Sequence, residues 1–287
     1  MAVSEPVNVR GAMDINLTTL TENTATRGFI GEWGLSIFIE ADNKHILFDT
    51  GPGFSAIYNA QPLGIDFKTI DTIVLSHGHF DHTGGLKDVL TRKGTVDVIA
   101  HPDIWGKKYS FRENNYHYTG IPFRKEQLEG LGARFTLSRN PIWISDNIVT
   151  SGEVPFITGY EETDQSLYKI DNNSLIRDNF TDDLSLAIKT DKGLSIFLGC
   201  AHRGMINIIN HFQETTEEER VYSVVGGTHL ISASQERLDK TIADLKKTGI
   251  QKLGVSHCTG FDASIRLAEK FKDIFFLNSS GSRHKLL

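Results

Sequence analysis

A short apolar run that ends abruptly in metal-ligand side chains constrains the fold of this 287-residue chain more than any other feature. Residues 73–75 read Ile-Val-Leu, a run typical of a strand that is buried on both faces. Gly84-Gly85 then predicts a turn into a helix that starts at Leu86. Between the strand and the turn lie four polar side chains, which are His77, His79, Asp81 and His82. They are therefore predicted to occupy a strand-to-helix loop at the carboxyl end of a strand, where α/β folds place their ligands.

The residue types in this loop favour a metal site. In an extended loop His77 and His79 point to the same side, and Asp81 and His82 follow as the chain turns. One metal ion could take the first pair and a second ion the next pair. Imidazole and carboxylate ligands suit zinc, iron or manganese. The alternative is a solvated polar loop, which four ligand-type residues within six positions make the weaker interpretation.

One loop rarely supplies all ligands of a two-metal site, so further ligands are expected at other strand ends. Cys200 and His202 follow an apolar strand and would face the same side of an extended chain. His257 ends the strand 252–257, and His229 lies just beyond the strand 221–225. We expect His202 and His257 to be ligands, and we leave His229 open between catalysis and support of a ligand.

The spacing His77-x-His79-x-Asp81-His82 matches the motif of the metallo-β-lactamase superfamily, and residues 47–51 resemble its early Asp-Thr-Gly turn. The resemblance implies an α/β fold, an αββα sandwich built from two similar halves. It also implies one domain over residues 1–287, with two divalent metal ions. Zinc is the expected metal, with manganese, iron and magnesium as alternatives.

The resemblance also assigns roles to individual residues. It gives His257 the place of the last metal histidine, and it gives Cys200 the place where many relatives carry an aspartate that bridges the metals. Either the Cys200 thiolate or His202 could supply the missing ligand. Glu153 lies where relatives place a histidine, so it is expected to contact metal or substrate. We expect Asp81 to take part in catalysis, and His229 is the candidate for a catalytic acid or base if it does not support a ligand.

The order of predicted elements suggests an internal duplication. Predicted hairpins span residues 35–40 with 45–49, and residues 184–189 with 194–198. Aligned without gaps, residues 35–51 and 184–200 are identical at five of seventeen positions. Because any α/β chain repeats such elements, the residues alone favour neither interpretation. The resemblance favours duplication.

Residues 103–179 form a less regular excursion that we predict to bind substrate. Aromatic and cationic residues alternate between positions 105 and 125 without clear periodicity, as expected for a flap that stacks a flat ring and pairs with phosphate. A surface excursion with half-buried aromatic residues is the alternative. We expect residues 161–179 to be a mobile loop. The candidate substrate contacts are Lys108, Tyr109, Arg112 and Arg124.

The C-terminal third contains two predicted helices. Residues 232–235 resemble a capping box, and Asp262 could cap the second helix. A last strand is predicted at 274–277.

Composition argues against several classes of protein. The net charge of −6 gives no general attraction to nucleic acid or to an anionic membrane. The sequence has no long apolar window and no signal-like start, so we expect neither a membrane span nor secretion. Two cysteines cannot build a disulfide framework, which fits the cytoplasm. We expect a small anionic or phosphorylated substrate, and a homo-oligomer remains open.

Four stretches together resemble one branch of the superfamily, which is named for 7,8-dihydropterin-6-methyl-4-(β-D-ribofuranosyl)aminobenzene-5′-phosphate synthase. The stretches are 75–86, 199–204, 226–230 and 257–260. The branch implies a transferase in which metals hold a pterin diphosphate for attack by an aminobenzene ribotide. A hydrolase of a phosphoester, lactone or amide is the alternative, in which metals lower the pKa of water from 15.7 toward about 7. A non-catalytic metal-bound ligand sensor is a third hypothesis.

Overall fold

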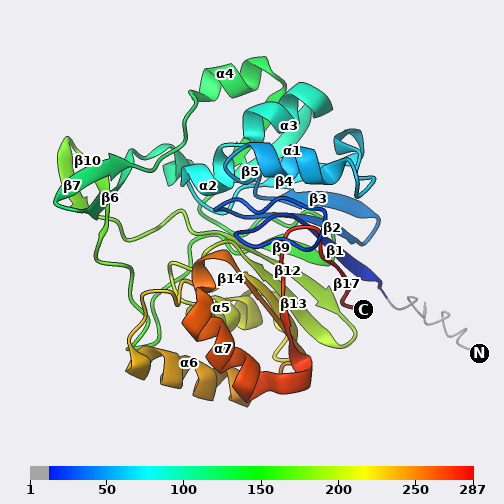
Figure 1. Cartoon of the computed structure of the whole chain (residues 1–287), viewed down its shortest axis with the longest axis vertical. Coiled ribbons are helices and arrows are strands. Elements are labelled where there is room, and N and C mark those ends of the chain that lie inside the picture. Colours follow the sequence, from blue (N-terminus) through cyan, green and yellow to red (C-terminus); the bar gives the residue numbers. More distant parts are fainter. Residues whose placement is uncertain (1–12) are drawn as a thin grey trace, which may run out of the picture.

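The computed structural model describes residues 13–287, in which two β-sheets pack face to face and helices cover their outer faces (Figure 1). The first sheet has the strand order β17-β1-β2-β3-β4-β5-β8. Its strands are β1 (Ile15–Thr21), β2 (Ser36–Ala41), β3 (Lys44–Phe48), β4 (Thr72–Val74), β5 (Val96–Ala100), β8 (Ala133–Leu137) and β17 (Arg283–Lys285). The helices of this half are α1 (Phe54–Ala60), α2 (Phe80–Thr83), α3 (Leu86–Lys93) and α4 (Lys125–Gly130).

The second sheet has the order β16-β15-β14-β13-β12-β9. Its strands are β9 (Ile148–Thr150), β12 (Ser185–Thr190), β13 (Gly193–Leu198), β14 (Val221–Gly227), β15 (Lys252–Ser256) and β16 (Phe275–Leu277). Its helices are α5 (Met205–Thr216), α6 (Gln235–Thr248) and α7 (Phe261–Phe271). Short 3-10 helices lie at Phe67–Thr69, Pro102–Trp105, His257–Thr259 and Lys272–Ile274.

Three apolar clusters hold these layers together. One lies between the first sheet and α1, α3 and α4, and another lies between the second sheet and α5, α6 and α7. The third fills the space between the sheets, where Phe48 and Val74 meet Phe197 and Val225, all fully buried. Burying a side chain of this size stabilises the folded state by about 1.5–3 kcal/mol. These layers are the predicted αββα sandwich.

The two halves repeat the same strand directions. From β1 to β8 along the first sheet, two antiparallel pairings are followed by three parallel ones. From β9 to β16 along the second sheet, the pairings follow the same series. The two sheets therefore have the same series of antiparallel and parallel strand pairings, which confirms that the chain is built from two similar halves.

The excursion contains more regular structure than the sequence predicts. It forms a side sheet of four strands, defined here as β6 (Lys108–Arg112), β7 (Asn115–Tyr118), β10 (Leu167–Asp171) and β11 (Ser174–Arg177), which projects from the sandwich (Figure 1). The segment 105–125, predicted to lack regular periodicity, therefore contains a hairpin, and the predicted loop 161–179 contains a second one. Each hairpin turns through two residues with positive φ, Glu113-Asn114 and Asn172-Asn173. The two hairpins then pair through β6 and β10. The pattern of residue types within either hairpin does not predict this pairing.

Two predicted helix starts also differ from the structure. The N-cap of α6 is Ser234, whose hydroxyl accepts the Arg237 N–H, while the Ser232 hydroxyl donates to the Asp164 carboxylate instead. Helix α7 starts after Gly260, and Asp262 lies inside its first turn. The strand predicted at 274–277 is present as β16.

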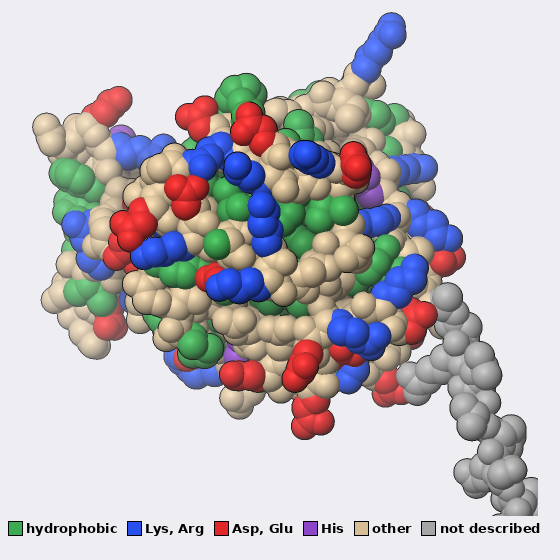
Figure 2. Space-filling model, turned by 90° about the horizontal axis from the view of Figure 1, so that it is seen from below, with side chains coloured by type: hydrophobic (Ala, Val, Ile, Leu, Met, Phe, Trp, Pro, Cys, Tyr) green, Lys and Arg blue, Asp and Glu red, His purple; other side chains and the backbone are tan. Residues whose placement is uncertain are grey.

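The outer face of the second half carries charges of both signs. Figure 2 shows basic and acidic side chains interspersed over this face, with apolar side chains between them. Within residues 13–287 no helix combines the length and the hydropathy that crossing a bilayer requires.

Candidate metal centre

The candidate site lies where parallel strands of both sheets end. His77 follows β4, and His79, Asp81 and His82 lie on or beside α2. In the second half, His202 follows β13 and His257 follows β15. Because the two halves repeat the same strand directions, these ends face each other and bring the side chains together.

The first triad consists of His77, His79 and His202, whose nearest ring nitrogens all lie within 4.8 Å of one another. His77 Nε2 lies 3.0 Å from His79 Nδ1 and 3.2 Å from His202 Nε2. Burial lowers the pKa of His77 and of His202, and it lowers the pKa of His79 to about 3. The three imidazoles are therefore neutral, as metal binding requires.

The second triad consists of Asp81, His82 and His257. His257 Nε2 lies 3.3 Å from His82 Nε2 and 3.4 Å from Asp81 Oδ2. Burial would raise the pKa of Asp81, but the hydrogen bond from His257 and the neighbouring imidazoles hold that pKa well below its ordinary value. The carboxylate is therefore available as an anionic ligand.

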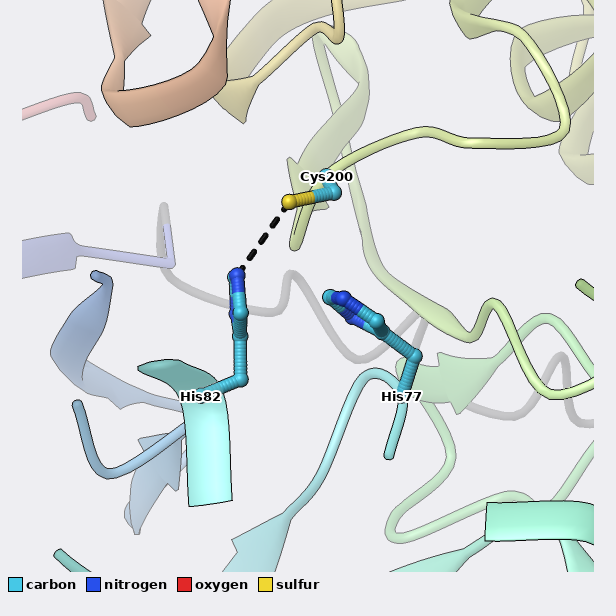
Figure 3. A group of neighbouring side chains, drawn as sticks. All are labelled: His77, His82 and Cys200. Carbon is cyan, nitrogen blue, oxygen red and sulfur yellow. Dashed lines mark hydrogen bonds between the residues drawn. The ribbon is translucent and has the colours of Figure 1, made fainter. Parts of the chain in front are cut away.

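Cys200 lies beside both triads. Its Sγ is 3.2 Å from His82 Nε2, and Figure 3 shows this sulfur and the two rings of His77 and His82 converging on one space. Burial raises the pKa of the Cys200 thiol. The second cysteine, Cys258, is equally buried and is also a free thiol.

Buried side chains next to the two triads hold the imidazole rings in place. Asp49 Oδ2 lies 2.6 Å from His82 Nδ1, and its other oxygen accepts the Ser76 N–H. Burial would lower the pKa of His82, but Asp49 raises it to about 9. Phe180 stacks on the His202 ring at a centroid distance of 3.7 Å. Such contacts fix the orientation of each imidazole ring.

Backbone strain gathers around the same centre. Five non-glycine residues with positive φ border it, and these are Asp49, Phe180, Ala201, His229 and His257. Each such conformation costs on the order of 1–3 kcal/mol and persists where surrounding contacts fix it. Strain of this kind is typical of functional sites.

The donor set fits metal ions. In the first triad, His77 Nε2 lies 3.0 Å from His79 Nδ1 and 3.2 Å from His202 Nε2. Neutral imidazoles whose nitrogens converge in this way offer their lone pairs to a metal ion. Imidazole, carboxylate and thiol together are the donors that zinc and iron take in proteins.

A cavity of about 670 Å³ opens onto both triads. The side sheet forms its far wall, through Ser110, Arg112, His117 and Leu167. His229 also lines the cavity, with its Nε2 3.7 Å from Asp164 Oδ2. Burial would lower the pKa of His229, whereas Asp164 and Cys258 raise it to about 9.

Four other candidate residues lie away from the lining of this cavity. Lys108 is buried and pairs with Asp178 at 2.6 Å and Asp182 at 2.8 Å, so it ties β6 to the loop before β12. Tyr109 packs edge-on against Tyr118. Arg124 is the N-cap residue of α4.

Glu153, the fourth of these residues, binds two groups outside the triads. Its carboxylate lies 3.0 Å from His101 Nε2 and also pairs with Arg139.

Several residues of the centre escaped sequence reasoning. The sequence could have indicated Asp49, because this residue ends a predicted strand directly before Thr50-Gly51. Phe180, Asp164 and Trp33, whose ring lies 5.0 Å from that of His257, had no such signal, because each reaches the site from a loop without a motif.

Comparisons with known proteins agree with this geometry. Residues 34–163 match the model of the metallo-beta-lactamase superfamily. The chain is 38% identical to the 7,8-dihydropterin-6-methyl-4-(beta-D-ribofuranosyl)-aminobenzene-5'-phosphate synthase of Methanocaldococcus jannaschii, over 94% of this chain and 96% of the relative.

Solved structures give the same family. Tm1679, described as a metal-dependent hydrolase of the beta-lactamase superfamily, superposes with a TM-score of 0.81 at 27% identity, over 94% of this chain and 98% of that one. Zinc-bound PqqB from Methylobacterium extorquens shares the fold at 11% identity, with a TM-score of 0.58 over 94% of this chain and 99% of that one. The chain therefore belongs to the metallo-beta-lactamase superfamily, in the branch related to the dihydropterin ribofuranosyl aminobenzene phosphate synthase.

Proposed function

We propose that this chain is a two-metal enzyme that joins an activated 6-methyl-dihydropterin to an aminobenzene ribofuranosyl phosphate. The observation that carries the proposal is that two complete ligand triads open onto one cavity. The relative that is 38% identical over nearly the whole chain is named for this product, which supports the choice of reaction.

The residues that would hold the ions are the two triads. His77, His79 and His202 would bind one ion, and Asp81, His82 and His257 the other. Bound divalent ions supply stabilisation of the negative charge that develops on a diphosphate leaving group. Zinc is the metal that we propose for both positions.

In the proposed reaction the amine nitrogen of the ribotide forms a bond to the pterin methyl carbon. The bond from that carbon to the diphosphate oxygen breaks, and the nitrogen loses a proton. Arg112 lines the cavity and can pair with a phosphate group. His229, kept protonated beside Asp164, can donate a hydrogen bond or a proton to the departing oxygen.

The second candidate is hydrolysis at the same centre. The observation that favours it is the 27% identity to a protein described as a metal-dependent hydrolase. In this reaction water, rather than an amine, attacks a phosphoester, lactone or amide. The two candidates therefore differ in whether a second organic substrate is required.

One assay separates these reactions. Purified protein is incubated with the pterin diphosphate, with and without the aminobenzene ribotide, and both diphosphate release and the coupled product are measured. Release that requires the ribotide and yields the coupled mass supports the synthase. Equal release in both mixtures indicates hydrolysis, and binding of either compound without any release indicates a ligand sensor.

Variants test whether the triads hold the metals. His77→Ala and Asp81→Ala are each expected to lose at least one bound ion by elemental analysis and to lose turnover by about a thousandfold or more, as loss of a catalytic metal would. His45→Ala is the matched control, because His45 is half-exposed in β3 and lies outside both triads. Retention of two ions by either triad variant would contradict the assignment.

A further inference from the structure

Both cysteines of the chain lie at the metal centre, although neither is in a disulfide. The chain has two cysteines, and Cys200 and Cys258 are each about 3% exposed. They come from different strand ends, Cys200 after β13 and Cys258 after β15. Free thiols in this position need a role other than cross-linking.

The Cys200 sulfur lies between the two triads. It is within 4.8 Å of donor atoms of His77 and His82, and it forms similar groups with His202 and His229 and with His257 and Cys258. His77 and His202 belong to the first triad, whereas His82 and His257 belong to the second. The sulfur is thus within reach of ligand atoms from both sets at once (Figure 3).

We propose that Cys200 is a sulfur ligand shared by the two metal ions. The inference rests on the two-metal part of the proposed function and is independent of which reaction follows. The sulfur lies 3.2 Å from His82 Nε2, and His82 itself belongs to a triad. The sulfur therefore shares one buried space with ligand-type atoms of both triads.

Cys258 differs from Cys200 because its sulfur is already engaged by the backbone. Its Sγ accepts the His229 N–H at 3.3 Å and donates to the Cys200 carbonyl at 3.5 Å. A β-carbon at Gly227 would approach this sulfur to 2.8 Å, so β14 packs closely against it. Cys258 therefore supports the Cys200 loop and serves as the matched control.

A shared thiolate has a consequence for metal choice. Thiolate ligands select zinc, iron or cobalt, whereas carboxylate and water ligands suit magnesium and manganese. Asp81 would be the one carboxylate in the set of seven donors formed by the two triads and Cys200. The centre should therefore discriminate strongly against magnesium.

Cobalt titration tests the proposal without any substrate. Metal-free protein under reducing conditions is titrated with Co²⁺, and sulfur-to-cobalt charge-transfer absorption is followed in the near ultraviolet. The wild type should bind two equivalents, with the band growing through both, because one sulfur contacts both ions. Saturation of the band after one equivalent would overturn the shared ligand.

Three variants test which cysteine supplies the sulfur ligand. Cys200→Ser should abolish the band and weaken the second equivalent by about tenfold or more, since loss of even an outer partner has an effect of that size. Cys200→Asp should bind two equivalents without the band and gain affinity for Mn²⁺ relative to Zn²⁺. Cys258→Ser should keep both band and stoichiometry.

The outcomes are decisive even if one variant folds poorly. A band that survives in Cys200→Ser, or disappears in a folded Cys258→Ser, would overturn the proposal. Circular dichroism establishes which variants are folded, and the wild-type titration needs no variant. Since no turnover is measured, a sulfur ligand in a protein that fails the synthase assay would leave this inference intact.

Discussion

At the scale of single residues, Asp49 orients His82 without belonging to either triad. Its carboxylate lies 2.6 Å from His82 Nδ1 and leaves Nε2 of that ring directed at the centre. Asp49→Asn keeps the shape but removes the charge that orients the imidazole. We expect metal affinity at the second triad to fall about 10–100-fold, measured by equilibrium dialysis with elemental analysis.

The control for this change is Asp97→Asn, an exposed aspartate that pairs with Arg134 on the surface. Unchanged affinity in Asp49→Asn would mean that packing alone orients His82.

Asp183 gives the fold a pH dependence. Burial raises its pKa from 3.8 to about 7, although the Arg203 N–H donates to it at 2.8 Å. The folded state therefore holds a proton that the unfolded chain releases above about pH 4. This bound proton stabilises the folded state by roughly 4 kcal/mol at most. The stabilisation is fully present below pH 4 and is lost as the pH rises to about 7.

Asp183→Asn should remove this dependence, because the amide carries no charge at any pH. The free energy of unfolding in urea is measured at pH 5, 6, 7 and 8 for both proteins. We expect the variant to gain stability relative to the wild type as the pH rises. A constant difference across this range would show that Asp183 is ionised throughout.

The sequence predicts residues best where chemistry is local. His77, His79, Asp81 and His82 lie within six positions, so their proximity required no knowledge of the fold. His202 and His257 could be added because parallel strands end at the same sheet edge. Glu153 could not be placed, because its pairing with His101 and Arg139 joins three separate loops.

At the scale of elements, Glu161 replaces a missing helix cap. Helix α5 starts after Gly204, which has no side chain to cap it, and Glu161 accepts the N–H groups of Ile206 and Asn207 at 2.9 and 2.8 Å. Glu161→Ala should therefore destabilise the protein by about 1–2 kcal/mol. Chemical unfolding measures the difference.

The neighbouring Glu162→Ala is the matched control, since the Glu162 side chain is exposed and only its carbonyl oxygen is bonded, by Arg237. Equal effects of the two substitutions would contradict the capping role.

Helices and strands were predicted well where the local residue pattern determines them, and poorly where pairing with a distant strand does. The hairpin β2-β3 turns at Asp42-Asn43, two residues that favour the left-handed conformation they adopt. The side sheet carries a similar turn signal at Asn172-Asn173, but its four strands form one sheet because β6 pairs with β10 more than fifty residues away. Long-range pairing of this kind cannot be deduced from the residues of one segment.

At the scale of the whole molecule, each of the two triads joins the two halves. His202 completes the first triad and His257 the second, while their other residues come from the first half. Ions bound here should stabilise the folded state, by about 4 kcal/mol when their concentration is a thousand times the Kd. Chelation should then lower Tm by roughly 10 °C, measured by scanning calorimetry.

Asp81→Ala tests the origin of this shift, because a variant with an incomplete triad has less bound metal to lose. Its Tm should respond less to chelation than that of the wild type. The same response in both proteins would place the stabilising ion elsewhere.

The pairing of β1 with β17 brings the two ends of the described chain together. Asn16 lies opposite Lys285, and the Ile15 N–H donates to the Leu287 carbonyl oxygen at 3.4 Å. Joining these ends and opening the chain between β8 and β9 would give a circular permutant in which the second half is synthesised first. Since both halves carry the same strand order, such a permutant can rebuild the same interface and both triads.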